Sequence, residues 1–138
     1  MNYLLLRVAH IAAVAAWISG MLAQAIAIRR LGQASTGSPS WLPKMITLDR
    51  LVTTPAMFLV WALGLTLAVR GHWFPAPWLL LKLTIVVALS ALHGTLAGTV
   101  RRISRDPSLP IAAPLGQADI LIVLAVVAAL TLALNKPF

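Results

Sequence analysis

The sequence predicts an all-α integral membrane protein, a four-helix bundle that forms one membrane domain over residues 1–138. Two observations predict this fold. The chain is 60% hydrophobic and 10% charged, whereas soluble domains carry about 25% charged residues. The apolar residues also gather in four long runs, and a helix that crosses the hydrocarbon core needs roughly 20 mostly apolar residues. The lipid bilayer is therefore the expected surrounding of the chain.

Each apolar run is predicted to form one membrane-spanning helix. The second run has no charged residue, and the third contains Lys82 and His93. A cleaved signal peptide is not expected, because Arg7 lies within the first apolar run rather than before it. The expected spans cover residues 4–28, 51–69, 78–100 and 116–135.

The basic residues indicate how the spans are oriented. With four spans, the first and third connections lie on one side of the membrane, and Arg70 and Lys136 lie on the other. By the positive-inside rule, loops one and three are cytoplasmic and both termini are outside. This orientation accounts for the net charge of +8, so no nucleic-acid partner is expected. The basic residues of loops one and three are Arg29, Arg30, Lys44, Arg50, Arg101, Arg102 and Arg105.

Several classes of chemistry are excluded by what the chain lacks. It has no cysteine, which removes disulfides, thiolate metal sites, covalent haem attachment and cysteine nucleophiles. Its three acidic residues, Asp49, Asp106 and Asp119, lie outside the predicted mid-membrane region. Acid–base catalysis by a pair of carboxylates within the membrane is therefore not expected.

The polar residues of the first and third runs are predicted to face the bundle interior, because an ionisable group that faces lipid costs several kcal/mol. At about 1.5 Å per residue, His10 lies roughly 10 Å and Lys82 roughly 6 Å from the outer ends of their helices. The long lysine side chain can reach further, so the two groups can meet at one depth. His93 shares a helical face with Lys82 but lies roughly 16 Å deeper. Arg7 and Lys82 can instead extend to the headgroups, and His72 in the outer loop is expected to be solvated.

A histidine inside a helical bundle is the ligand type that b-type haem uses. Four glycines remove side chains where a flat macrocycle or another helix could approach: Gly20, Gly64, Gly94 and Gly98. Gly94 and Gly98 form a GxxxG motif, for which tight helix packing is the structural interpretation.

Four segments, read in order, resemble the HemJ family within the wider HemJ/CopD-like group of small membrane proteins. They are "RVAHIAAVAAWISGML", "TTPAMFLVWALGLTL", "WLLLKLTIVVALSALHG" and the closing "NKPF". The resemblance covers nearly the whole chain. Two features differ from the family pattern and mark a divergent member. Leu80 stands where the family often has a histidine, and "AQAIAIRR" stands where it has a Pro-Arg and a further histidine.

The resemblance implies a protoporphyrinogen IX oxidase associated with b-type haem, in a bacterial inner membrane. His10, Lys82 and His93 match the family's polar positions, and Arg7 matches its basic residue. We therefore expect His10 and Lys82 to be catalytic and to bind haem iron, with His93 as the other candidate ligand. Arg7 and Arg70 are candidates to bind the porphyrin carboxylates. A quinone or another membrane acceptor would take the electrons, and a homo-oligomer is expected.

Two alternatives remain open at the level of sequence. A CopD-like copper protein would use His10, His93 and either Met21 or Met57, because Cu(I) favours soft donors. A non-catalytic haem-binding or electron-transfer protein would carry the same haem ligands without oxidising porphyrinogen.

Overall fold

The computed structural model describes residues 2–33, 37 and 39–135, and all of the regular structure there is helical. Residues 34–36 and 38 of the first loop, and Lys136, Pro137 and Phe138 of the "NKPF" end, lie outside the described residues. The helices are α1 (Tyr3–Gln33), α2 (Leu42–Leu48), the π-helical turn η1 (Asp49–Thr53), α3 (Thr54–Arg70), α4 (Pro77–Arg105), the 3-10 turn η2 (Ala113–Gln117) and α5 (Ala118–Asn135).

Within the described residues, four helical segments are long and apolar enough to cross a membrane. They comprise 31, 29, 29 and 23 residues, because α2, η1 and α3 form one continuous helix, and so do η2 and α5. At about 1.5 Å per residue, even the shortest is longer than the roughly 30 Å hydrocarbon core. The all-helical class and the multi-pass organisation predicted from the sequence are confirmed. The second helix begins at Leu42, well before residue 51, so Lys44, Asp49 and Arg50 are helical rather than part of a loop.

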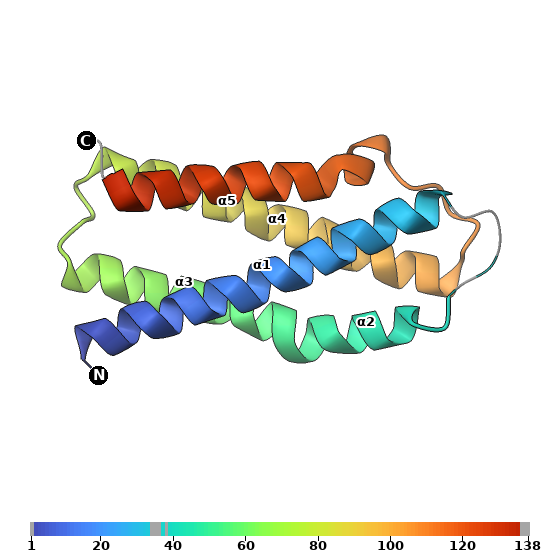
Figure 1. Cartoon of the computed structure of the whole chain (residues 1–138), viewed down its shortest axis with the longest axis horizontal. Helices are drawn as coiled ribbons and strands as arrows, with labels where there is room; N and C mark the ends of the chain where they lie inside the picture. Colours follow the sequence, from blue (N-terminus) through green and yellow to red (C-terminus); the bar gives the residue numbers. More distant parts are fainter. Residues whose placement is uncertain (1, 34–36, 38, 136–138) are drawn as a thin grey trace.

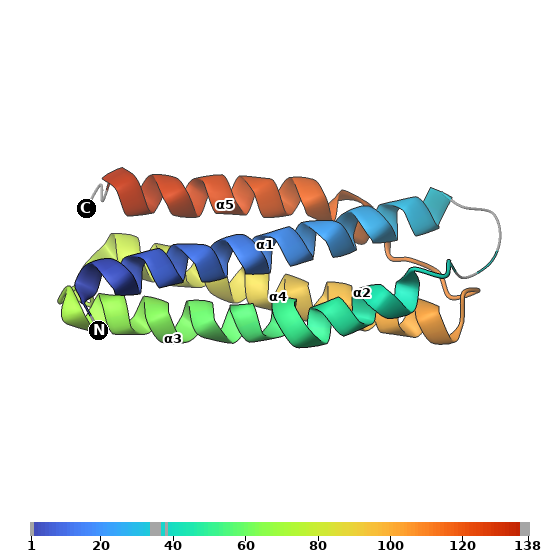
Figure 2. The same ribbon diagram turned by 60° about the horizontal axis from the view of Figure 1, so that its bottom comes forward.

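Helix α1 is the central element of the bundle. It packs against α3, α4 and α5, and Figures 1 and 2 show it running between α5 on one side and the α2–α3 helix on the other. The start of α1, the α3–α4 connection and the end of α5 lie at one end of the bundle (Figure 1). The opposite end carries the α1–α2 connection and the α4–η2 connection. This arrangement is an up-down-up-down bundle.

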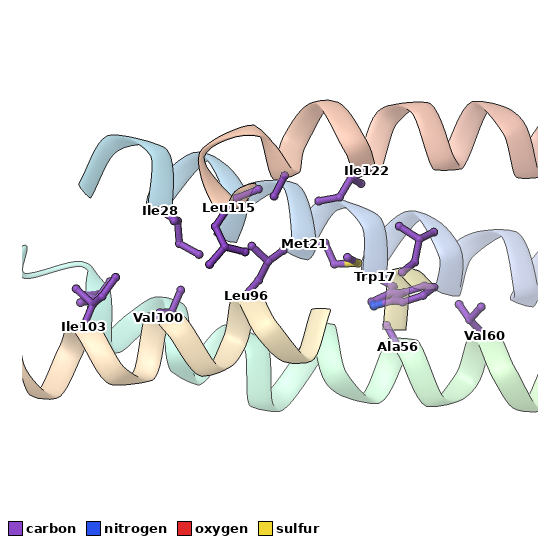
Figure 3. Close-up of a cluster of buried hydrophobic side chains, with 14 of the residues drawn as sticks. Trp17, Met21, Ile28, Ala56, Val60, Leu96, Val100, Ile103, Leu115 and Ile122 are labelled. Atoms are coloured by element: carbon purple, nitrogen blue, oxygen red, sulfur yellow. The ribbon is translucent and has the colours of Figure 1, made fainter. Parts of the chain in front are cut away.

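The core forms where the helices turn one stripe toward α1. On α1, the residues Trp17, Met21 and Ile28 are each at most 1% exposed, and their spacing of four and seven keeps them on one helical face. Leu96 and Val100 of α4 and Ile122 of α5 meet this stripe (Figure 3). The outer faces remain apolar and exposed, on α5 above all. In water such a surface would be a liability, and in lipid it is the expected one.

The contact between α1 and η1 depends on Gly20. A Cβ atom at this position would lie 2.1 Å from Oγ1 of Thr53, which is itself buried. Only a residue without a side chain allows the two backbones to approach this closely. One of the four glycines expected to permit a close approach therefore does so between helices.

Polar contacts gather at the end of the bundle that carries the α1–α2 and α4–η2 connections. There, Arg29 of α1 pairs with Asp119 at the start of α5 and donates a hydrogen bond to the Gly116 carbonyl. After α4, the hydroxyl and the backbone N–H of Ser108 donate to Asp106, and these bonds hold the pKa of Asp106 below its usual range.

The α3–α4 connection, at the other end, folds on its aromatic residues. The rings of Trp73 and Trp78 lie 5.5 Å apart, and Trp78 is buried. His72 is exposed, as expected, and adopts a left-handed backbone conformation with φ of 53°.

Candidate functional site

A cavity of about 380 Å³ lies in the half of the bundle nearer the start of α1 and the α3–α4 connection. Helices α1, α3, α4 and α5 all contribute to its wall, which is mostly apolar. Trp73 and Trp78, at the α3–α4 connection, also line it. Leu134, which is strongly exposed, forms part of the rim. The cavity therefore opens at the surface of the bundle that faces lipid.

His10 is the polar side chain of most chemical interest in this cavity. It lines the wall from α1 and is partly buried. The backbone of Val60 approaches the ring, but the buried Nδ1 atom has no hydrogen-bond partner among the described residues. Gly64 of α3 makes room for the imidazole, because a Cβ there would lie 3.0 Å from Cε1 of His10. Gly64 is therefore the second of the four predicted glycines that permits a close approach, in this case of the His10 ring to α3.

Two cations share the cavity with His10. Lys82 of α4 lines it and lies close enough to His10 for their charges to interact. Arg7, one helical turn before His10, lines it as well and is exposed. The structure therefore brings Arg7, His10 and Lys82 together at one cavity. Arg70 is exposed at the end of α3 and is not among the residues that line the cavity.

His93 lies apart from this cavity, in a separate buried cluster. The Nε1–H group of Trp17 donates to Nδ1 of His93 across 3.1 Å. Nε2 of His93 lies 2.8 Å from Oδ1 of Asp49. Because Nδ1 accepts a hydrogen bond, the proton of a neutral imidazole is on Nε2 and is donated to the carboxylate. Both ring nitrogens are therefore engaged, and His93 does not meet His10 at one site.

Asp49 is the functional residue that sequence reasoning missed. It is 3% exposed, so a carboxylate lies inside the bundle. It also lies within the second membrane-spanning segment, Leu42–Arg70, whereas the sequence placed it before a span that begins at residue 51. Besides His93, it contacts the Thr54 hydroxyl at 3.5 Å and Nη1 of Arg101 at 3.8 Å. The side chain of Gln24 also approaches the carboxylate, and its Oε1 atom has no partner among the described residues.

The backbone at Asp49 departs from α-helical geometry. Asp49 opens the π-helical turn η1, which joins α2 to α3. Such turns are rare and appear frequently at functional sites, because the extra residue changes which side chains face the neighbouring helix. Here the turn begins at the carboxylate that reaches His93.

The donor set expected for copper is divided between two places. Met57 lies near His93, with its Sδ atom 3.4 Å from Nδ1. Met21 is fully buried in the apolar core, and His10 lines the separate cavity. Among the described residues, no group of three or more His, Cys, Asp or Glu side chains is arranged to hold a metal ion.

The GxxxG motif does not join two helices of this chain. A Cβ atom added at Gly94 or Gly98 would meet no other side chain or neighbouring helix within 4 Å. Within the part of the chain that the structure describes, these two glycines therefore face open space.

Comparisons of the chain with protein-family models, with curated proteins and with solved structures found no match.

Proposed function

We propose that the chain is a membrane-embedded, haem-b-binding oxidoreductase of the HemJ type. It would oxidise protoporphyrinogen IX to protoporphyrin IX and pass the electrons to a membrane acceptor such as quinone, in a bacterial inner membrane. The observation that supports this most directly is that His10 lines an apolar cavity beside Lys82 and that its buried Nδ1 atom has no hydrogen-bond partner among the described residues.

The residues of the cavity fit a haem group. Imidazole is a common axial ligand of haem iron, and the Nδ1 atom of His10 is not used by the protein among the described residues. The two faces of the haem macrocycle are apolar, and most of the cavity wall is apolar as well. The two carboxylates of the macrocycle would find cationic partners in Lys82 and Arg7. The volume of about 380 Å³ falls within the range of about 300–1,000 Å³ typical of ligand sites.

Each residue has a distinct role in this proposal. His10 would hold the iron, and Gly64 leaves space for its ring. Lys82 and Arg7 would pair with carboxylates, of the haem or of a porphyrinogen substrate. Trp73 and Trp78 would keep water from the outer end of the cavity. Haem, when bound, supplies one-electron redox chemistry that the side chains themselves lack. His93 and Arg70 are not part of the proposed binding set, because they do not line the cavity.

The test is expression in haem-replete cells, purification in detergent and an absorption spectrum. We expect a Soret band in the unaltered protein and its loss in His10→Ala. His72→Ala is the matched control, because His72 is an exposed histidine outside the cavity, and it should keep the band. A preparation that contains no haem, or one in which His10→Ala keeps the full spectrum, would refute the proposed site.

Catalysis requires a separate experiment. Rescue of a strain that lacks protoporphyrinogen oxidase would support the enzyme, and Lys82→Gln should weaken the rescue if Lys82 binds substrate carboxylates. A haem-loaded protein that never rescues the strain would be a haem-binding or electron-transfer protein. Metal analysis that finds copper and no haem would favour the copper-handling alternative.

A further inference from the structure

Trp17 connects the cavity to the buried cluster around His93. Its indole lines the cavity, and its Nε1–H group donates to Nδ1 of His93. His93 in turn contacts Asp49, and Asp49 contacts Arg101, whose side chain is 38% exposed. A continuous series of polar groups therefore runs from the cavity to the end of the bundle that carries the α4–η2 connection. Ionisable groups in this position inside membrane proteins commonly take part in proton transfer.

The surroundings of His93 provide for two protonation states. In the neutral ring, Nδ1 accepts from Trp17 and Nε2–H donates to Asp49. The Sδ atom of Met57 lies 3.4 Å from the same Nδ1 atom, and a thioether sulfur can only accept a hydrogen bond. It cannot form a hydrogen bond with a ring nitrogen that carries no proton. It becomes a partner once Nδ1 is protonated, and Asp49 then faces a positively charged ring.

We propose that His93 and Asp49 form a proton-binding site that is coupled to the cavity through Trp17. On uptake of one proton, an N–H bond forms at Nδ1 of His93 and the hydrogen bond from Trp17 breaks. The Nε2–H group remains bonded to Asp49, so the added charge is balanced by the carboxylate. The N–H group of Trp17 is then released toward the cavity, where a ligand with an acceptor group takes it. No electron is transferred in this step, and one proton is gained.

The groups that face the pair come from three elements. Helix α4 contributes Arg101, helix α1 contributes Trp17 and Gln24, and α3 contributes Thr54 and Met57. Arg101 opposes a second positive charge, but its exposed side chain keeps access to solvent and its distance of 3.8 Å from Asp49 is long. Asp49, at 2.8 Å, is the closest charged contact of His93, so its carboxylate balances the charge that an added proton brings.

This coupling places a proton-binding group one hydrogen bond behind the cavity wall. The indole N–H of Trp17 donates only and does not relay a proton itself, so His93 takes its proton from the side of Asp49 and Arg101. Oxidation of a porphyrinogen releases protons as well as electrons, and lipid cannot take them up. The use of the site in that reaction rests on the proposed function. The proton site itself does not, because it is formed by the protein alone.

The proton site can be tested on haem-free protein in detergent. The chain has three histidines, so ¹⁵N NMR of histidine-labelled protein gives three ring systems, which His10→Gln and His72→Gln assign. We expect the neutral Nε2–H form of His93 at high pH and protonation at Nδ1 as the pH falls. Trp17→Phe removes the competing donor and should raise the midpoint by about one pH unit. Asp49→Asn should lower it by about one to three units.

Two further variants, Met57→Leu and Asp106→Asn, complete the NMR titration. The first removes the acceptor for the new N–H group and should lower the midpoint, while the second alters an exposed acid far from the pair and should leave it unchanged. A His93 ring that stays neutral from about pH 5 to pH 8, in the unaltered protein and in Trp17→Phe alike, would overturn the proposal. If Trp17→Phe does not fold, the Met57→Leu and Asp49→Asn shifts decide.

The coupling is tested with metal-free protoporphyrin IX as the probe. Its binding in weakly buffered solution should take up protons in the unaltered protein and take up fewer in Asp49→Asn. Binding without proton uptake would refute the coupling and leave the cavity proposal intact. If the porphyrin does not bind, the proposed function fails, whereas the NMR titration still decides whether His93 is a proton site.

Discussion

The Nε2 atom of His93 lies 2.8 Å from Oδ1 of Asp49, although the two residues are 44 positions apart in the chain. Both side chains are 4% exposed, so water does not compensate for the loss of either partner. The pair joins α4 to the π-helical turn between α2 and α3. It therefore links two membrane-spanning helices, α4 and the continuous helix of α2, η1 and α3.

Replacing one partner of this pair should destabilise the bundle strongly. Asp49→Ala leaves His93 without its acceptor and is expected to cost about 3–5 kcal/mol, as for other broken buried pairs. Asp49→Asn should cost clearly less, because an amide oxygen can still accept from Nε2–H. Thermal unfolding in detergent measures both. Asp106→Ala is the control at an exposed acid, and equal losses in Asp49→Ala and Asp106→Ala would show that the buried pair does not stabilise the fold.

The Gly20 position provides a second test, of the contact between α1 and η1. In Gly20→Ala the new methyl group would lie 2.1 Å from Oγ1 of Thr53, so the helices must separate, at a cost of at least about 1–3 kcal/mol. Gly98→Ala adds the same methyl group where no neighbour lies within 4 Å, and it should be neutral or slightly stabilising.

The mutant Thr53→Ala shows whether the clash is the cause. Thr53→Ala removes the two closest atoms and leaves Cβ at 2.8 Å from the added methyl group. The double variant Gly20→Ala/Thr53→Ala should therefore lose less free energy of unfolding than the sum of the losses in the two single variants. Strict additivity would mean that the loss in Gly20→Ala has another origin.

Gly64 tests the position of His10 rather than the fold. In Gly64→Ala the new Cβ lies 3.0 Å from Cε1 of His10, so the ring must shift by a few tenths of an ångström. We expect the variant to fold and, if haem is bound at His10, to retain it about tenfold less well, as when other residues that orient a ligand are altered. Haem content after purification and dilution measures this. Gly94→Ala, which meets no neighbour within 4 Å, should match the unaltered protein, and the same retention in both variants would place the haem away from His10.

The helices and the meeting of His10 and Lys82 at one cavity could be predicted because both follow from local properties, the apolar runs and the helical rise. Asp49 could not be found in this way. It lies just before the uncharged apolar run of the second span, so the sequence placed it in the preceding loop. The sequence did contain one signal, a helical spacing that continues through Asp49. The structure buries all the residues with this spacing, which are Leu42, Asp49, Thr53, Ala56 and Val60. Its partner could not be predicted, since the contact with His93 depends on how two distant helices pack. The tautomer of His93 depends on a third helix, through Trp17.

The orientation of the bundle in the membrane is the last prediction. The positive-inside rule places the α1–α2 and α4–η2 connections in the cytoplasm, and the chain has no cysteine to interfere with labelling. Two single-cysteine variants test it at exposed positions: Phe74→Cys in the α3–α4 connection and Leu109→Cys after α4. In intact spheroplasts, a membrane-impermeant maleimide should label the first and not the second. After permeabilisation both should react, which shows that both sites are accessible, while the cysteine-free protein stays unlabelled. Labelling of Leu109→Cys alone in intact spheroplasts would reverse the orientation, and the proton site would then open to the outer side.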